Sequence, residues 1–352
     1  MHLLAKASVL GLLTALAPSI FADGRNPGSL LVYPVQRSGF DFNGGPEANG
    51  GAPFFTVASV TNTNLNPIAG STQVHFEYVN KLENDTLASC YVNNVFETLT
   101  PADTLSVLTA CHNSPAAAGY LVVTAKNPAT FDTYWSFNYL IGSELVVTSR
   151  GSAYAMNAMP FESPLAEGLD TDLDLDDVKD FDGAEYEGIP EYLYIDSHIA
   201  ATGGSLALIN MTGGTDFIAN VKFDAWNDNE RQLSATYAFK CWDEVLLFNI
   251  GSGTGFGPGT IFNDNYLFFN TLNSPFELDV DCDGLGDVET SWARINGINA
   301  SSNVESVPNA ALLGAMTGSF TGFTTGRLLW ESRTKQLNGD FLNFGGDDPE
   351  FP

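Results

Sequence analysis

The alternation of apolar and polar side chains along several segments is the feature that most constrains this fold. In residues 72–79 every second side chain is apolar, while His75 and Glu77 fall on the opposite, polar face, where we expect His75 at the surface. Residues 217–242 contain two alternating runs around a polar turn, which predicts a β-hairpin. A period of two is typical of a strand with one buried face. Glycine and asparagine recur between such runs, so we expect an all-β chain of many short strands.

Two pairs of segments resemble each other, which indicates an internal repeat. In each case an apolar or alternating run ends in a polar turn. The similar segments are 54–64 and 71–80 with 204–214 and 216–230, and 119–142 with 326–346. Two related β-sandwich domains, immunoglobulin-like or jelly-roll-like, would explain the repeat. The alternative is that any two β-sandwiches share alternating strands.

The N-terminus has the pattern of a secretory signal peptide. Lys6 precedes an apolar run that is too short to span a bilayer comfortably. A buried N-terminal helix is the alternative. No later segment has an apolar run of membrane length, so we expect a secreted chain, extracellular or periplasmic, without membrane insertion. The expected order is signal peptide 1–22, β-sandwich domain 23–165, acidic linker 166–196 and β-sandwich domain 197–352.

The chain is strongly acidic, with a formal net charge of −28. Such a charge repels nucleic acid and anionic membranes, so neither is an expected partner. It favours metal cations and cationic partners. Residues 167–196 hold 12 acidic side chains and one lysine. Carboxylates at this density repel one another, so the segment is either a solvated flexible linker or a calcium site. The candidate ligands there are Asp172, Asp174, Asp176, Asp180, Asp182 and Glu185.

A second acidic stretch, residues 279–290, reads DVDCDGLGDVET. Aspartates alternate over its first five positions and Gly284 occupies the sixth, where a calcium loop needs a sharp bend. The stretch resembles EF-hand loops, and its ending is closer to thrombospondin type 3 and related bacterial calcium repeats. The twelfth position departs from that pattern because it is Thr290 instead of a carboxylate. An ordinary acidic turn is the alternative. The ligands that the resemblance implies are Asp279, Asp281, Asp283, Leu285 through its carbonyl, Asp287 and Glu289.

The chain has an even number of cysteines in an expected oxidising compartment, which favours two disulfides. We expect Cys90 to pair with Cys111 and Cys241 with Cys282, because each pair lies within one predicted domain. The alternating pattern also places Trp226 and Trp242 on the outward face of their strands. There they could stack on sugar rings or form a protein interface, or be covered by another layer.

The sequence contains no recognisable catalytic motif, so we expect no enzymatic chemistry. The predicted function is a secreted, calcium-binding structural or adhesion protein of the extracellular matrix or cell surface, with a protein or polysaccharide partner. Two alternatives remain. One is a carbohydrate-binding module, and the other is an extracellular polymer hydrolase that uses carboxylate catalysis.

Overall fold

The protein is nearly all β. The computed structural model describes residues 26–39, 55–81, 86–113, 118–130, 133–147, 153–176, 178–199, 203–214, 216–227, 230, 232–250, 282–283, 290–320 and 323–341. Within these ranges the helical elements are α1 (Thr109–His112) and the 3-10 turn η1 (Leu247–Asn249). The all-β prediction is therefore confirmed. The fold is built from four antiparallel sheets of four to six strands, together with two short ribbons.

The first half of the chain forms sheets 1 and 2. Sheet 1 has the strand order β5-β2-β7-β8 and sheet 2 the order β4-β3-β6-β1-β9. The strands of sheet 1 are β2 (Phe55–Asn62), β5 (Thr104–Leu108), β7 (Leu140–Val147) and β8 (Ala153–Asn157). Those of sheet 2 are β1 (Leu30–Arg37), β3 (Thr72–Lys81), β4 (Tyr91–Leu99), β6 (Ala118–Lys126) and β9 (Met159–Phe161).

The second half forms sheets 3 and 4, with orders β16-β13-β19-β20 and β15-β14-β17-β12-β21; β18 also pairs with β17. Sheet 3 consists of β13 (Gly203–Asn210), β16 (Trp242–Leu246), β19 (Leu312–Phe320) and β20 (Phe323–Leu328). Sheet 4 consists of β12 (Leu193–Ile199), β14 (Ile218–Asn227), β15 (Gln232–Lys240), β17 (Thr290–Ser301), β18 (Ser306–Pro308) and β21 (Trp330–Glu331). The ribbons pair β10 (Lys179–Phe181) with β23 (Gly339–Phe341), and β11 (Ile189–Pro190) with β22 (Lys335–Gln336). Strands β14 and β15 form the hairpin that the sequence predicted.

The two halves repeat the same strand order. The path β4-β3-β6-β1 in sheet 2 matches β15-β14-β17-β12 in sheet 4, and β5-β2-β7 in sheet 1 matches β16-β13-β19 in sheet 3. The similar segments 54–64 and 71–80, against 204–214 and 216–230, thus supply equivalent strands. The second predicted similarity is wrong, because β17 occupies the place of β6 while the described part of the other segment, residues 326–341, supplies edge strands and ribbons.

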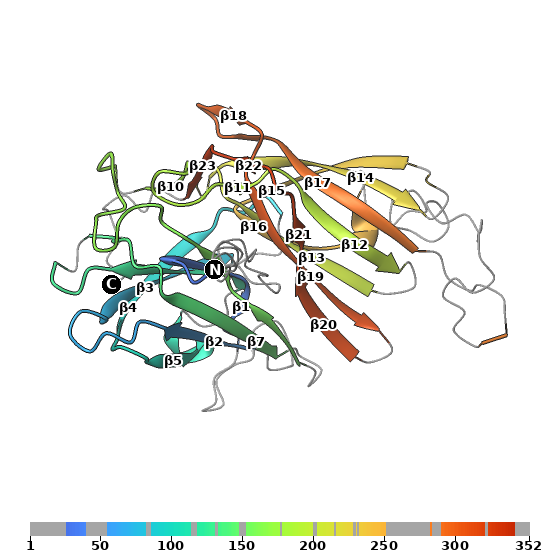
Figure 1. Ribbon diagram of the computed structural model, residues 1–352. Coiled ribbons are helices and arrows are strands. Elements are labelled where there is room, and N and C mark those ends of the chain that lie inside the picture. Colours follow the sequence, from blue (N-terminus) through green and yellow to red (C-terminus); the bar gives the residue numbers. More distant parts are fainter. Residues whose placement is uncertain are drawn as a thin grey trace, which may run out of the picture.

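Apolar clusters join the sheets into one body. One cluster lies between sheets 1 and 2 and another between sheets 3 and 4. A third is shared by sheets 2 and 3 and contains Tyr120, Phe181 and Trp242. The sheet 4 strands β14 and β17 and the sheet 1 strands β2 and β5 lie at opposite ends of the molecule (Figure 1). Because each large buried side chain contributes about 1.5–3 kcal/mol, the shared third cluster holds the halves together.

Two placements from the alternating pattern are wrong. His75 and Glu77 were expected on a polar face, yet both are buried because sheet 2 is covered on both faces. Trp242 was placed on the outward face of the hairpin, and of the alternatives stated for it the structure supports coverage by another layer: it is only 4% exposed, and its Nε1 donates to the carbonyl of Pro34 at 3.0 Å. The reason is a break in the strand. The backbone of Cys241 is left-handed, with φ of 45°, so Trp242 begins a strand of a different sheet.

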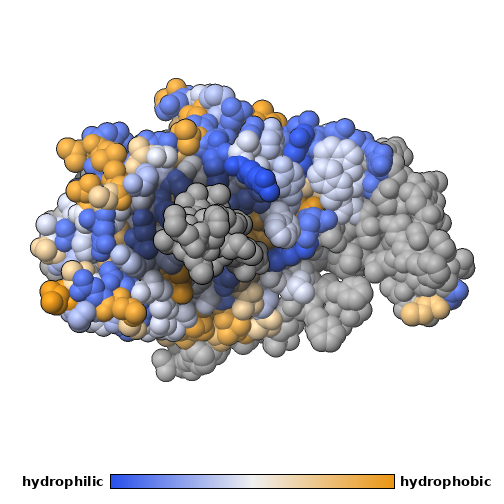
Figure 2. Space-filling model, viewed as in Figure 1, coloured by the Kyte–Doolittle hydropathy of each residue, from blue (hydrophilic) through white to orange (hydrophobic). Residues whose placement is uncertain are grey.

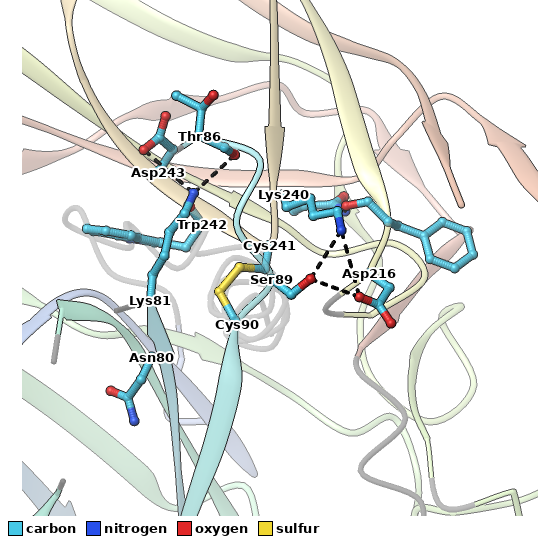
Figure 3. Close-up of a disulfide and its surroundings, with 12 residues drawn as sticks. Asn80, Lys81, Thr86, Ser89, Cys90, Asp216, Lys240, Cys241, Trp242 and Asp243 are labelled. Carbon is cyan, nitrogen blue, oxygen red and sulfur yellow. Dashed lines mark hydrogen bonds and ion pairs between the residues drawn. A yellow bond between two sulfur atoms is a disulfide. The ribbon is translucent and has the colours of Figure 1, made fainter. Parts of the chain in front are cut away.

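A disulfide between Cys90 and Cys241 crosses the junction of the two halves (Figure 3), with Cα atoms 6.3 Å apart. The expected pairs are therefore wrong, and Cys111 and Cys282 are exposed free thiols. Polar contacts flank the bridge. Lys81 Nζ donates to the carbonyls of Thr86 at 3.1 Å and Trp242 at 2.9 Å. Pairing by domain failed because the start of β4 and the end of β15 meet where the halves pack together.

We predict that Cys90→Ser lowers the free energy of unfolding by about 2–5 kcal/mol, as expected for loss of a bridge between distant positions. Thermal unfolding followed by circular dichroism measures the loss. The matched control is Cys111→Ser, which removes an exposed free thiol. Equal melting temperatures for the two variants would contradict a stabilising role for the bridge.

Candidate functional site

The acidic segment between the halves is folded against the protein. Phe181, Tyr186 and Ile189 are buried and belong to the cluster shared by sheets 2 and 3. The segment also contributes β10 and β11, each paired with a strand from the C-terminal region. Its aspartates are therefore carried on a loop whose C-terminal side is fixed by apolar packing.

Asp172, Asp174 and Asp176 are brought together at the start of this segment. One carboxylate oxygen from each lies within 4.8 Å of the others. The loop between them turns tightly, because Leu175 has a φ of 63°. Asp172 Oδ1 accepts the backbone N–H of Asp176 at 3.2 Å. The three alternating carboxylates are thus gathered on one tight turn of the loop.

The carboxylate of Glu185 holds the loop by accepting two backbone hydrogen bonds. Its Oε1 accepts the N–H of Leu173 at 2.5 Å, and its Oε2 accepts the N–H of Asp180 at 3.1 Å. The side chain is buried, and burial raises the pKa of its carboxyl to about 7, helped by the charges of Asp180 and Asp172 and opposed by the two backbone bonds. Burial and the charges of Asp176 and Asp172 also raise the pKa of Asp174. Repulsion between neighbouring carboxylates is thus a secondary cause of both pKa shifts, after burial.

The other predicted ligands lie elsewhere. Asp182 Oδ1 accepts the N–H groups of Ala184 at 2.7 Å and Glu185 at 3.0 Å, so this carboxylate caps its own turn. Asp180 lies in β10, where its carbonyl accepts the N–H of Tyr186. Of the predicted loop 279–290, Cys282 and Asp283 are exposed, and the candidate ligands Asp279, Asp281, Leu285, Asp287 and Glu289 lie outside the described residues. That loop stays a sequence prediction.

A buried ion pair anchors the acidic segment to sheet 2. Lys179 Nζ lies 2.7 Å from Glu77 Oε1, and both side chains are almost fully buried. Thr124 donates to the other Glu77 oxygen at 3.3 Å, and Tyr134 lies within 3.3 Å of Lys179. The aspartate cluster is thus only a few residues from a fixed point in the core. Sequence analysis missed this pair because nothing in the alternating pattern shows that the polar face of β3 is covered.

His75 shares this polar cluster. Its Nδ1 is 3.1 Å from the hydroxyl of Tyr134 and its Nε2 is 3.0 Å from Asn94 Oδ1, while Phe96 stacks on its ring. Burial lowers the pKa of His75 to about 4; Glu77 opposes this effect, and Lys179 and Lys126 add to it. His75 is therefore neutral in the folded protein near neutral pH.

The predicted stacking residue Trp226 is half-buried on the outer face of sheet 4. Its ring stacks on that of Trp292 with centroids 4.2 Å apart. Sequence analysis missed Trp292, although it alternates with buried residues in β17 just as Trp226 does in β14.

Comparison of the chain with protein-family models, curated proteins and solved structures finds no match. Among the described residues, no helix has the length and apolar character needed to cross a membrane. Any statement about function therefore depends on the geometry of this chain.

We predict that Lys179→Met destabilises the fold by about 3–5 kcal/mol, because it leaves the Glu77 carboxylate buried without its cation. Adding Glu77→Gln to that variant should recover part of the loss. Chemical denaturation of Lys179→Met, of Glu77→Gln and of the double variant measures this. If the double variant were as unstable as the sum of the two single variants, the pair would not be coupled.

The pKa of His75 predicts an acid-dependent loss of stability. The folded protein resists protonation until about pH 4, whereas an unfolded histidine takes up a proton near pH 6.5. The stabilising contribution of neutral His75 is complete above pH 6.5 and is lost as pH falls towards 4, by roughly 3 kcal/mol in total. Denaturation at several pH values should show a shallower slope for His75→Gln over this window. Parallel slopes would disprove the assignment.

Proposed function

We propose that the chain is a secreted, calcium-binding structural or adhesion protein made of two related β-sandwich domains, immunoglobulin-like or jelly-roll-like. The repeated strand order of the two halves supports the duplication. The disulfide is compatible with an oxidising, extracellular compartment.

The observation that carries the calcium proposal is the convergence of Asp172, Asp174 and Asp176. Calcium takes six to eight oxygen ligands in flexible geometry, so three carboxylates, loop carbonyls and water would suffice. Without a cation, carboxylate oxygens this close repel one another. The tight turn at Leu175 and the backbone N–H groups that donate to Glu185 hold the loop in shape, which lowers the free-energy cost of organising a site.

The proposed role of calcium is structural. The loop leads directly into β10, whose Phe181 covers the outer face of sheet 2. A bound cation would neutralise the loop and hold this covering segment in place. A site with an affinity typical of extracellular modules, with a dissociation constant of about 0.1–1 mM, would be filled outside a cell.

The test is a calorimetric calcium titration of the mature protein, with thermal unfolding in calcium and in EDTA. We predict a measurable heat of calcium binding. We also predict that the free energy of unfolding rises by about 2.7 kcal/mol when the calcium concentration exceeds the dissociation constant a hundredfold. Asp174→Asn should weaken binding at least tenfold. Asp281→Asn tests the loop at 279–290 separately.

The matched control is Glu305→Gln, which removes one exposed charge far along the chain from the acidic segment. It should bind calcium as the unaltered protein does. An absence of binding at millimolar calcium would end the proposal, as would equal weakening by Glu305→Gln and Asp174→Asn, because the effect would then be one of net charge.

A further inference from the structure

The outer face of sheet 4 carries a set of aromatic rings around one arginine, which we call the aromatic face. In one row across the sheet, Asp224 lies opposite Arg294, Arg294 opposite Tyr194, and Tyr194 opposite Trp330. In the adjacent row, Trp226 lies opposite Trp292. The aromatic face consists of Tyr192, Tyr194, Trp226, Trp292, Arg294 and Trp330.

Large parts of these rings are exposed. Trp292 is 42% exposed and Trp330 is 59% exposed. Leaving tryptophan rings in water forgoes the stabilisation that burial would give, so grouped exposed rings are typical of binding surfaces. In Figure 2 the described surface over β12, β14 and β17 is mostly pale and blue, which fits a mixture of aromatic and charged residues on this part of the molecule.

The rings are held in place by fixed charges. Arg294 lies over the ring of Tyr192 at 5.0 Å and over that of Trp226 at 5.9 Å. Its guanidinium donates to Asp224 Oδ2 at 3.0 Å, and Lys222 Nζ is 3.0 Å from the other oxygen. Burial alone would raise the pKa of Asp224, but bonds from Ser234, Lys222 and Arg294 outweigh it and lower the pKa to about 2. The face is therefore preorganised.

The outer edge is arranged in the same way. Trp330 Nε1 donates to Asp196 Oδ2 at 3.0 Å, and Arg327 lies 2.6 Å from the other oxygen of Asp196. Each cation described on this face thus has an acidic partner. The face is close to neutral in a chain whose net charge is −28.

In the first half of the chain, the equivalent face belongs to sheet 2 and is covered by other segments. The sequence VKFDAWN (221–227) matches VHFEYVN (74–80), and Glu77 lies opposite Val122 as Asp224 lies opposite Arg294. By the same register, Val79 and Tyr120 occupy the places of Trp226 and Trp292.

Val79, Tyr120 and Val122 are fully buried beneath Phe181 and Trp242. The first half therefore uses aliphatic groups and one tyrosine where another segment packs. The second half has tryptophans and an arginine at those places and leaves the rings open to solvent.

We propose that the aromatic face binds a neutral β-linked polysaccharide chain. Tryptophan faces stack on the apolar faces of pyranose rings, and the arginine, aspartate and indole N–H groups beside them suit sugar hydroxyls. The strongly acidic chain disfavours a polyanion. Trp292 and Trp330 are two strands apart across the sheet and two residues apart along the strand direction. The two residues are therefore separated by roughly 12 Å, which is the length of a short oligosaccharide.

This surface lies on β12, β14, β17 and β21, apart from the aspartate cluster, so the inference does not depend on calcium binding. The inference names the chemical class of ligand that the proposed adhesion protein would bind. A second copy of this chain is the competing occupant, and the experiment separates that outcome from polysaccharide binding.

The test is sedimentation of the mature protein with insoluble cellulose and chitin, and affinity electrophoresis in gels containing soluble xylan or hydroxyethyl cellulose. We expect retention by at least one of these polymers. Trp292→Ala and Trp330→Ala should each weaken retention by roughly tenfold or more, as for truncation of an aromatic hot spot. Trp292→Phe keeps a ring and should retain most of the affinity.

Phe96→Ala is the control, because Phe96 is an exposed aromatic side chain of the first half, on β4. Its retention should equal that of the unaltered protein. Near-UV circular dichroism establishes that each variant is folded.

Retention by none of the four polymers, or retention that both alanine variants leave unchanged, would overturn the proposal. A dimer in sedimentation velocity that Trp292→Ala dissolves would assign the face to self-association instead. Unchanged retention by Asp174→Asn would separate this result from the calcium proposal.

Discussion

The burial of sheet 2 on both faces is the constraint on which the rest of the structure depends. One face packs on sheet 1, and the other meets sheet 3 and the acidic segment. A strand covered on both faces cannot leave its polar side chains in water, so each needs a partner inside the protein. Lys179 supplies that partner to Glu77 at 2.7 Å. This ion pair, together with the apolar packing of Phe181, Tyr186 and Ile189, fixes the position of the acidic segment next to the aspartate cluster.

The same carboxylate position has a different environment in the second half. Asp224 of β14 corresponds to Glu77 of β3, yet its cations come from its own sheet: Lys222 lies on the same strand and Arg294 on the neighbouring strand β17. No separate segment is required, so the outer face of sheet 4 is free to present aromatic rings. The difference between the halves is thus a difference in where the compensating charge comes from. In the first half it arrives on a covering segment, and in the second half it is built into the sheet.

The alternating pattern predicted much of the strand content, including the hairpin of β14 and β15, because it records which face of a strand is buried. It could not record that a polar face is also buried, which is why His75 and Glu77 were misplaced. The burial of Trp242 has a local cause: one left-handed residue, Cys241, moves the chain from sheet 4 to sheet 3. The disulfide could not be assigned from spacing, since Cys90 and Cys241 are 151 residues apart and meet only through the packing of the halves. The alternation of Asp172, Asp174 and Asp176 was visible in the sequence, whereas their convergence and the buried support from Glu185 depended on the path of the folded segment.

These features connect the two proposals without making one depend on the other. The repeated strand order produces two equivalent outer faces, and each exposes apolar area that must either be covered or be used. The acidic segment covers the first face, and it does so at the cost of placing several carboxylates close together, which a cation would relieve. The second face has no such cover among the described residues, and its exposed tryptophans are fixed by Arg294 instead of being buried. If both proposals hold, a cation at the aspartate cluster would stabilise the segment that covers one half, and the aromatic face would be the surface that the other half keeps open for a ligand.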